Sequence, residues 1–266
     1  SFDHKNEYND VQRGYNERLQ KANWINAQQT FSYDSLMIGT SRTTYINSHQ
    51  FNEKLFNFGL SNLHITEYLD VLRYAKEKNE KQFSTIYVEL TIASYDSRTK
   101  ATFTNTDEIL RQADDPFNKY VNLFSNETFE RAKENYEMSV ANASNLPRNY
   151  DRDLQVFTTF ESKNLERNLQ NFKQLLAARD ESVPDWMIYL EDYVSILKEI
   201  KALFPNAKII PFNDLIWSER LNYYIHHPQV TPAYKQYVTD VVTTFGEFYS
   251  FHQYNDITTD ASNFLD

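Results

Sequence analysis

The chain has 266 residues, enough to bury a full hydrophobic core, and it contains no cysteine, which excludes disulfides, thiolate metal ligands and a cysteine nucleophile. Its 27 basic and 37 acidic side chains give a formal net charge of -10, which argues against binding to nucleic acid or, through a polybasic patch, to anionic lipid. Hydrophobic residues make up 41% of the chain, which excludes disorder throughout, and no apolar run is long enough to span a membrane.

The first predicted element is a polar helix within residues 1–30, where tyrosine, valine, leucine and alanine recur at helical spacing. The short apolar run 35–39 ends on glycine and is typical of a buried strand, and 54–58 is a second such run. A helix over 66–78 and a β-branched strand over 84–90 follow. Two strands, a helix and a strand joined by short links predict an α/β domain with a parallel sheet.

Residues 104–180 show no strand pattern and alternate charged and aromatic side chains at helical period, which predicts a helical insertion. An amphipathic helix over 186–204, a fourth strand over 207–212, a helix over 232–244 and a fifth strand over 248–251 complete the predicted elements. Neither repeats nor low-complexity linkers interrupt them, so we expect all 266 residues to form one α/β domain in which helices flank a parallel sheet.

Gly39 and Ser41 follow the first predicted strand and form the first candidate site. Ligands of open parallel sheets bind at the carboxyl ends of the strands, and a glycine there allows a turn that directs a serine hydroxyl and amide toward one pocket. Gly59 ends the second strand at the same edge, so two of the chain's four glycines converge on one place. The pattern fits equally well a Ser41 that only caps the following helix.

Residues 38–42, Ile-Gly-Thr-Ser-Arg, resemble the first block of the SGNH/GDSL-like serine hydrolase and acyltransferase superfamily, in particular its extracytoplasmic branch. Residues 56–62, Phe-Asn-Phe-Gly-Leu-Ser-Asn, resemble the second block, whose glycine supplies an oxyanion-hole amide. Residues 263–266, Asn-Phe-Leu-Asp, are similar to the approach to the family's Asp-x-x-His block. The resemblance follows the order of elements over nearly the whole chain and implies a flavodoxin-like sheet flanked by helices.

This resemblance implies that Ser41 is the nucleophile and that the Ser41 and Gly59 amides hold the developing oxyanion. Asp266 would orient a catalytic histidine three residues beyond it. The family's Gly-x-Asn-Asp signature is missing from its place at 87–91, so Asn62 is the candidate for a side-chain donor. Arg42, next to Ser41, would hold an anionic group of the substrate or is a surface residue of the next helix.

The six histidines show no metal-ligand spacing, and no phosphate-binding loop or dinucleotide fingerprint occurs, so we expect neither a metal nor a cofactor. His226 and His227 are expected in a loop, whereas His64 and His252 are the alternatives for the missing base. The acidic pair at 114–115 is expected to cap helices and not to act as acid and base.

Taken with the resemblance, these patterns predict acyl transfer through an acyl-Ser41 intermediate, in an O-acyltransferase or esterase. The expected substrate is a cell-surface polysaccharide or teichoic-acid-type polymer, with a membrane-bound protein as the acyl donor. The expected location is extracytoplasmic, with a membrane anchor N-terminal to this chain. The missing third block and histidine favour an alternative, a catalytically inactive binding or assembly subunit of a cell-envelope modification system.

Overall fold

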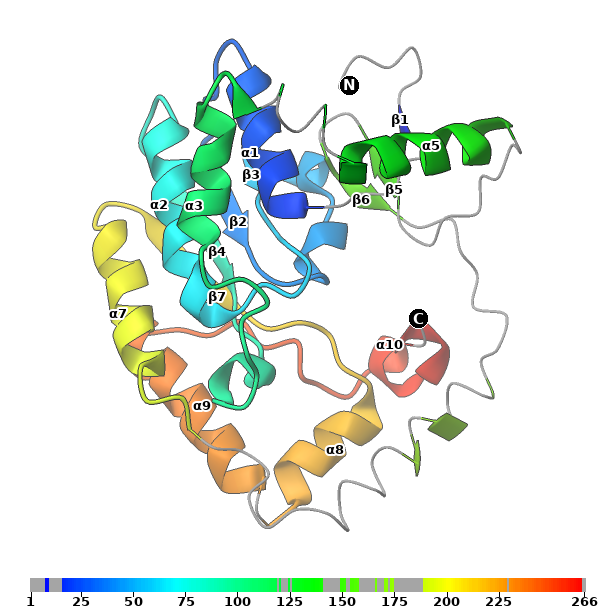
Figure 1. Ribbon diagram of the computed structural model, residues 1–266. Helices are drawn as coiled ribbons and strands as arrows, with labels where there is room; N and C mark the ends of the chain where they lie inside the picture. Colours follow the sequence, from blue (N-terminus) through cyan, green and yellow to red (C-terminus); the bar gives the residue numbers. More distant parts are fainter. Residues whose placement is uncertain are drawn as a thin grey trace. The chain divides into compact units, whose positions relative to one another are not determined.

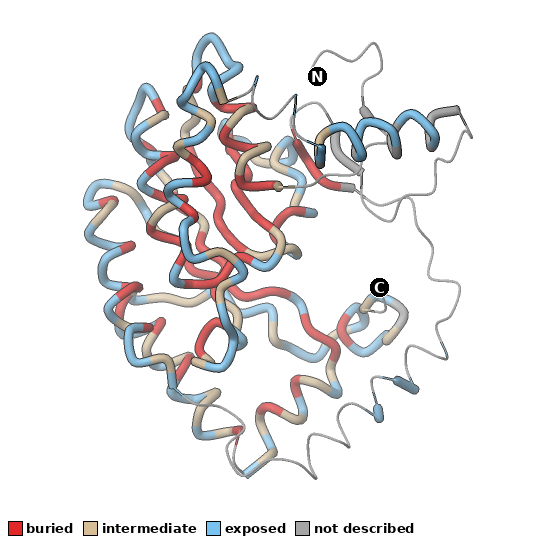
Figure 2. The backbone as a smooth tube through the Cα atoms, viewed as in Figure 1, coloured by how far each residue is buried: buried red, intermediate tan, exposed pale blue. Residues whose placement is uncertain are grey.

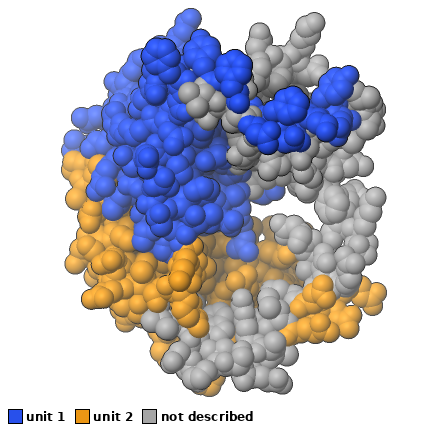
Figure 3. All heavy atoms as spheres, in the orientation of Figure 1, with its two compact units in different colours: residues 1–86, 101–160, 206–208 blue, residues 87–100, 161–205, 209–266 orange. Residues whose placement is uncertain are grey.

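A computed structural model describes the ranges 8–9, 16–118, 120, 124, 126–140, 149–151, 154–157, 166, 170–171, 173–174, 189–228 and 230–264. The chain divides into two compact units, which Figure 3 distinguishes by colour. Unit 1 comprises Ser1–Ile86, Ala101–Phe160 and Asn206–Lys208. Unit 2 comprises Tyr87–Lys100, Glu161–Pro205 and Ile209–Asp266. Neither unit is continuous in sequence, since each takes segments from distant parts of the chain.

One four-stranded parallel sheet flanked by helices gives the protein its α/β class, as predicted (Figure 1). Its strands are β2 (Ser35–Ile38), β3 (Leu55–Asn57), β4 (Thr85–Glu89) and β7 (Lys208–Phe212). The strand order is β3-β2-β4-β7, a flavodoxin-like arrangement in which the chain reverses direction across the sheet after its second strand. All four strands lie where apolar runs predicted them.

Burial explains why the sequences of β2 and β3 are mostly apolar. Every residue of β2 and β3 is buried (Figure 2), because helices cover parallel strands on both faces. The two strands pair in register, with Leu36 opposite Phe56. The pairing continues past the strand ends, since the Leu60 amide donates to the Gly39 carbonyl at 2.9 Å.

The predicted fifth strand is wrong in extent, because 248–251 contributes one parallel bridge, between Tyr249 and Phe212. The Phe251 amide donates to the Oδ1 atom of Asn213 at 2.7 Å and not to a backbone carbonyl. This side-chain bond ends the ladder after a single bridge.

Unit 1 includes the helices α1 (Glu17–Ala27), α2 (Tyr68–Lys78), α3 (Thr106–Arg111) and α5 (Asn126–Val140). The prediction of a helix within 1–30 is right only for its second half, since Tyr8–Asn9 forms a strand, β1. Asn16 sets the start of α1, because its side chain accepts a hydrogen bond from the Leu19 amide at 3.3 Å. Helix α3 packs against α1 and α2.

The prediction that residues 104–180 contain helices alone is also wrong. Two short strands, β5 (Asn149–Asp151) and β6 (Val156–Phe157), lie within it and pair antiparallel with each other. Strand β1 pairs antiparallel with β5 and completes a three-stranded sheet. Strands of two or three residues are too short to show the alternation by which a sequence reveals a strand.

Unit 2 includes the helices α7 (Tyr193–Leu203), α8 (Ser218–His226), α9 (Val230–Phe245) and α10 (Asp256–Thr259). Helix α9 contains the whole predicted helix, whereas α7 begins seven residues after the predicted start at 186, and 186–188 lie outside the described residues. Tyr189 instead forms an antiparallel bridge with Asp96. Short 3-10 turns complete both units: η1 (Thr43–Tyr45), η2 (Ser48–Gln50), η3 (Ile65–Glu67), η4 (Ile92–Tyr95), η5 (Gln112–Asp114) and η6 (Ala261–Phe264).

Candidate functional site

Ser41 lies in the turn that joins β2 to η1, at the carboxyl end of the strand, where the sequence placed it. The residue is half-buried, and within the described part of the chain its hydroxyl has no hydrogen-bond partner. The Thr44 hydroxyl donates to the Ser41 carbonyl and tightens the turn. The Ser41 side chain is therefore held at the end of the sheet with its hydroxyl uncommitted.

Asn57, the last residue of β3, holds this turn in place. Its buried Nδ2 donates to the carbonyls of Thr43 at 2.8 Å and Ile46 at 2.9 Å. Its Oδ1 accepts from the Gly59 amide at 2.8 Å. Both amide hydrogens and the amide oxygen are thus engaged, which links the Ser41 turn to the end of the neighbouring strand. We call Asn57 and its three partners, Thr43, Ile46 and Gly59, the Asn57 bracket.

Gly59 is required by the close approach of another backbone segment. A Cβ atom at this position would lie 2.9 Å from the Thr44 nitrogen and 3.1 Å from the Thr43 carbonyl carbon, too close for any side chain. The Gly59 amide points to Asn57 Oδ1, so its predicted role in an oxyanion hole requires that hydrogen bond to break. The role stays a prediction, but the structure shows a second reason for this glycine.

Two buried charged side chains of α1 bind groups of residues 57–61, which follow from the end of β3. The Lys21 ammonium donates to the carbonyls of Asn57 at 2.6 Å and Gly59 at 2.8 Å. The Glu17 carboxylate accepts from the Ser61 amide at 2.5 Å and from the Ser61 hydroxyl at 3.1 Å. Neither residue was predicted from the sequence, and their one detectable signal is a four-residue spacing that places them on one helix face.

A buried ion pair extends this support along α1. Arg18 and Glu67 are 2.7 Å apart, and their side chains are each 3% exposed. The Arg18 guanidinium also lies over the Phe103 ring, 4.3 Å from its centroid, and the Thr106 hydroxyl donates to Glu67. The Glu67 carboxylate thus accepts hydrogen bonds from Arg18, His64 and Thr106, which compensate for the burial of its charge.

His64, one of the two alternatives for a catalytic base, has a structural role. Its buried ring caps η3, with Nδ1 2.8 Å from the Thr66 hydroxyl, and its backbone amide donates to Glu67 at 3.1 Å. The cap occupies the Nδ1 atom of His64, and the role of this residue as a base for Ser41 stays a prediction. His252, the other alternative, belongs to unit 2.

The remaining predicted site residues are Arg42, Asn62 and Asp266. Arg42 is exposed and directly precedes η1. Asn62 is exposed, and its φ of 53° is a left-handed conformation that asparagine tolerates better than most residues. Asp266 lies outside the described residues, so its predicted role as the orienting aspartate is not tested.

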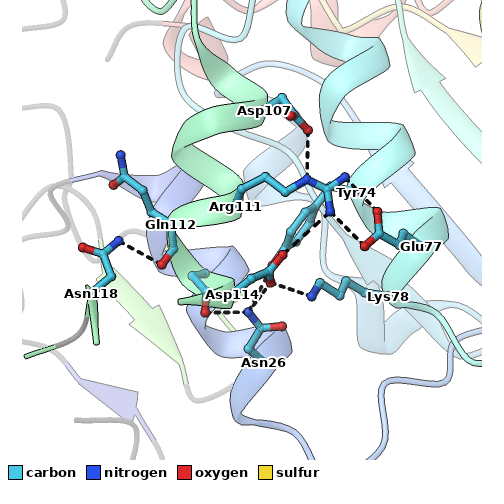
Figure 4. Close-up of polar contacts among 10 residues, drawn as sticks. Asn26, Tyr74, Glu77, Lys78, Asp107, Arg111, Gln112, Asp114 and Asn118 are labelled. Carbon is cyan, nitrogen blue, oxygen red and sulfur yellow. Dashed lines mark hydrogen bonds and ion pairs between the residues drawn. The ribbon is translucent and has the colours of Figure 1, made fainter. Parts of the chain in front are cut away.

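The acidic residues at 114–115 belong to a surface network that joins α1, α2 and the end of α3 (Figure 4). Asp114 accepts hydrogen bonds from Asn26 at 2.9 Å and Lys78 at 2.5 Å. Burial alone would raise the pKa of the Asp114 carboxyl, but hydrogen bonds from Lys78 and Asn26 outweigh it and hold that pKa below its ordinary value. The Asp115 carboxylate accepts from the Phe117 amide at 2.8 Å, so both acids have structural partners.

Comparison of the chain with protein-family models, with curated proteins and with solved structures gives no match. The SGNH resemblance therefore stays a prediction that rests on the quoted motifs. Among residues with described positions, no three His, Asp or Glu side chains gather closely enough to hold a metal ion. None of the helices in the described ranges combines the length and apolar composition needed to cross a membrane.

Proposed function

We propose that the protein is a serine-dependent acyltransferase or esterase of the SGNH type, with Ser41 as its nucleophile. The observation that carries this proposal is the placement of Ser41. Its hydroxyl is uncommitted in the turn after the first buried parallel strand, and the Asn57 bracket fixes that turn to the next strand. Ligands of this class of sheet bind at the carboxyl ends of the strands.

In the proposed reaction, the Ser41 oxygen forms a bond to the acyl carbon of an ester or thioester. The bond to the leaving oxygen or sulfur breaks, and the proton of the serine passes through the base to the leaving group. A hydroxyl of the acceptor, or water, then attacks the acyl-serine and regenerates Ser41. A serine hydroxyl needs a base for the first step, and the proposed base is the histidine that Asp266 would orient.

The proposed acceptor is a cell-surface polysaccharide or teichoic-acid-type polymer, and the proposed acyl donor is a membrane-bound protein. The formal net charge of -10 favours a neutral or cationic polymer over an anionic one, except where exposed Arg42 meets an anionic group locally. We propose an extracytoplasmic location for this activity, with a membrane anchor N-terminal to this chain.

The test is covalent labelling of the natural full-length protein with a fluorophosphonate, followed by mass spectrometry of the intact chain. We expect one adduct, which peptide mapping places on Ser41 and which Ser41→Ala abolishes. Ser61→Ala is the matched control, because Ser61 lies on the second block and its hydroxyl is bound to Glu17. Absence of an adduct in the folded protein across neutral and alkaline pH would refute the nucleophile.

One observation favours a second function, a catalytically inactive binding or assembly subunit of SGNH fold. The amide that an oxyanion hole would use, that of Gly59, is already bound to Asn57. A binding subunit would retain affinity for the surface polymer in Ser41→Ala and would give no adduct in the unmodified protein. The adduct therefore separates the two functions, and equilibrium binding of polymer fragments to both forms tests whether the polymer is the ligand.

A further inference from the structure

Aromatic rings form a continuous row through unit 2, and four of them are tyrosines. Centroid separations along the row are 5.1 Å from Tyr189 to Tyr95, 6.0 Å from Tyr95 to Tyr237, 6.0 Å from Tyr237 to Tyr234 and 5.8 Å from Tyr234 to His252. The residues come from four separate segments of the chain. Tertiary packing, and not sequence proximity, therefore creates the row.

The two ends of the row differ in their surroundings. Tyr189 is 43% exposed, whereas Tyr95 and Tyr237 are buried. At the other end, the Tyr234 hydroxyl and His252 Nδ1 are 2.9 Å apart, and the His252 side chain is only 1% exposed. His252 Nε2 lies 4.0 Å from Oδ1 of Asp214, whose side chain is 6% exposed. The row thus runs from solvent to a phenol that faces a buried imidazole and carboxylate.

This arrangement suits one-electron oxidation. A phenol that loses an electron becomes a strong acid and must release its proton, so a hydrogen-bonded base makes it easier to oxidise. Burial, followed by the neighbouring Tyr224, raises the pKa of Tyr234 to about 12, so the residue is protonated before oxidation. The His252 imidazole can take the proton, and the nearby Asp214 carboxylate favours the resulting cation.

The two rings in the middle of the row, Tyr95 and Tyr237, differ in whether a base lies next to the hydroxyl. The Tyr95 hydroxyl lies 3.5 Å from the Asp240 carboxylate, which can accept its proton. The Tyr237 hydroxyl donates to the Leu90 carbonyl, which is not a base, so Tyr237 keeps its proton and connects its neighbours as a ring. The chain has no cysteine, and Met37 is buried, so an exposed tyrosine such as Tyr189 is open to an oxidant in solution.

We propose that this row is a radical-transfer path, which carries an oxidising equivalent from Tyr189 at the surface to the Tyr234–His252 pair. The co-reactant is a one-electron oxidant in solution, such as a radical derived from a peroxide. The proposal is independent of the chemistry at Ser41.

The overall step is balanced by one electron and one proton. An electron leaves Tyr234, passes through the rings of Tyr237 and Tyr95 to Tyr189, and reduces the oxidant. The O–H bond of Tyr234 breaks and an N–H bond forms at Nδ1 of His252. The products are a neutral tyrosyl radical at Tyr234, an imidazolium at His252 and the reduced oxidant, while the other tyrosines end as they began.

The test generates tris(bipyridyl)ruthenium(III) in solution by a light flash with persulfate, freezes the sample and records the electron paramagnetic resonance spectrum. In the unmodified protein we expect a tyrosyl radical with the g-shift of a phenoxyl hydrogen-bonded to a cationic donor. Tyr234→Phe should abolish this signal. Tyr95→Phe should lose most of it and should increase dityrosine-linked dimers at Tyr189, mapped by mass spectrometry.

Each substitution by phenylalanine keeps the ring, and circular dichroism confirms that the variant is folded. Tyr254→Phe is the matched control, because Tyr254 is 56% exposed and lies outside the row. This control should leave the Tyr234 signal unchanged. An undiminished signal in Tyr95→Phe, or an equal loss in Tyr254→Phe, would overturn the path, since packing alone or direct oxidation of Tyr234 would then account for the observations.

Discussion

Replacing Asn57 by alanine removes the side chain that holds the Ser41 turn, and its cost follows from the contacts. Three hydrogen bonds disappear, to the carbonyls of Thr43 and Ile46 and from the amide of Gly59. At about 1 kcal/mol net for each bond, the loss amounts to about 3 kcal/mol. The polar groups left inside the protein add to this, so we expect the free energy of unfolding to fall by about 3–5 kcal/mol.

Urea denaturation followed by tryptophan fluorescence measures this change. Trp24 stacks on Phe56 of β3 with their ring centroids 5.5 Å apart, so its emission reports on the strand that carries Asn57. Asn52→Ala is the matched control, because Asn52 is an exposed asparagine five residues earlier. It should change the free energy of unfolding by no more than about 0.5 kcal/mol.

A second substitution separates the donors of Asn57 from its acceptor. Asn57→Asp keeps an oxygen for the Gly59 amide but replaces the donor by an oxygen that faces two carbonyls, so its loss should be at least as large as that of alanine. A loss below about 1 kcal/mol for Asn57→Ala, with an unchanged denaturant slope, would refute the bracket as the support of the Ser41 turn.

Three further predictions use the same denaturation assay. Gly59→Ala should lower the free energy of unfolding by about 1–3 kcal/mol, because its Cβ would meet the Thr44 backbone at 2.9 Å, and an unchanged midpoint would contradict that contact. Lys21→Met should lower the free energy of unfolding by about 1–3 kcal/mol, because the loss of two charge-assisted hydrogen bonds outweighs the removed cost of burying the charge. A rise in the free energy of unfolding would contradict this prediction. The depressed pKa of Asp114 stabilises the fold above its ordinary value of 3.8, and this stabilisation disappears as pH falls through the lower folded value. Asp114→Asn should therefore cost stability at about pH 6 and progressively less toward about pH 3, and a constant difference would contradict the linkage.

Local patterns were sufficient to predict the sheet. The run at 35–39 and the β-branched run at 84–90 are apolar because both strands lie in the covered interior of a parallel sheet, and burial of this kind leaves a direct trace in composition. Helix α9 was predicted for the same reason, since one face of it is buried at helical spacing. Strands β5 and β6 left no such trace because each has two or three residues.

The buried charged residues that contact the site could not be predicted from local patterns. Lys21 and Glu17 are residue types that are almost always exposed, and their helix was expected to be polar on that ground. Their burial depends on acceptors and donors 36 to 44 residues away in the sequence, at Asn57, Gly59 and Ser61. A single sequence carries no signal for such a pairing until the strand that presents those backbone groups has been placed beside the helix.

Whether the Gly59 amide can serve the proposed oxyanion hole depends on two free energies, that of its present hydrogen bond to Asn57 and that of a bond to the oxyanion. Its hydrogen bond to Asn57 contributes about 0.5–1.5 kcal/mol, whereas one oxyanion-hole donor contributes about 2.7–4 kcal/mol to a transition state. If Ser41 forms an acyl-enzyme, exchanging the first bond for the second is favourable by about 1 kcal/mol or more, before the cost of turning the peptide is counted. That cost is set by the Thr43–Thr44 backbone packed against Gly59 and by Lys21, which holds the carbonyls of the two flanking peptide units, those of Asn57 and Gly59. Lys21 therefore affects whether the amide can turn, and Lys21→Met should change the rate of Ser41 labelling as well as the stability of the fold.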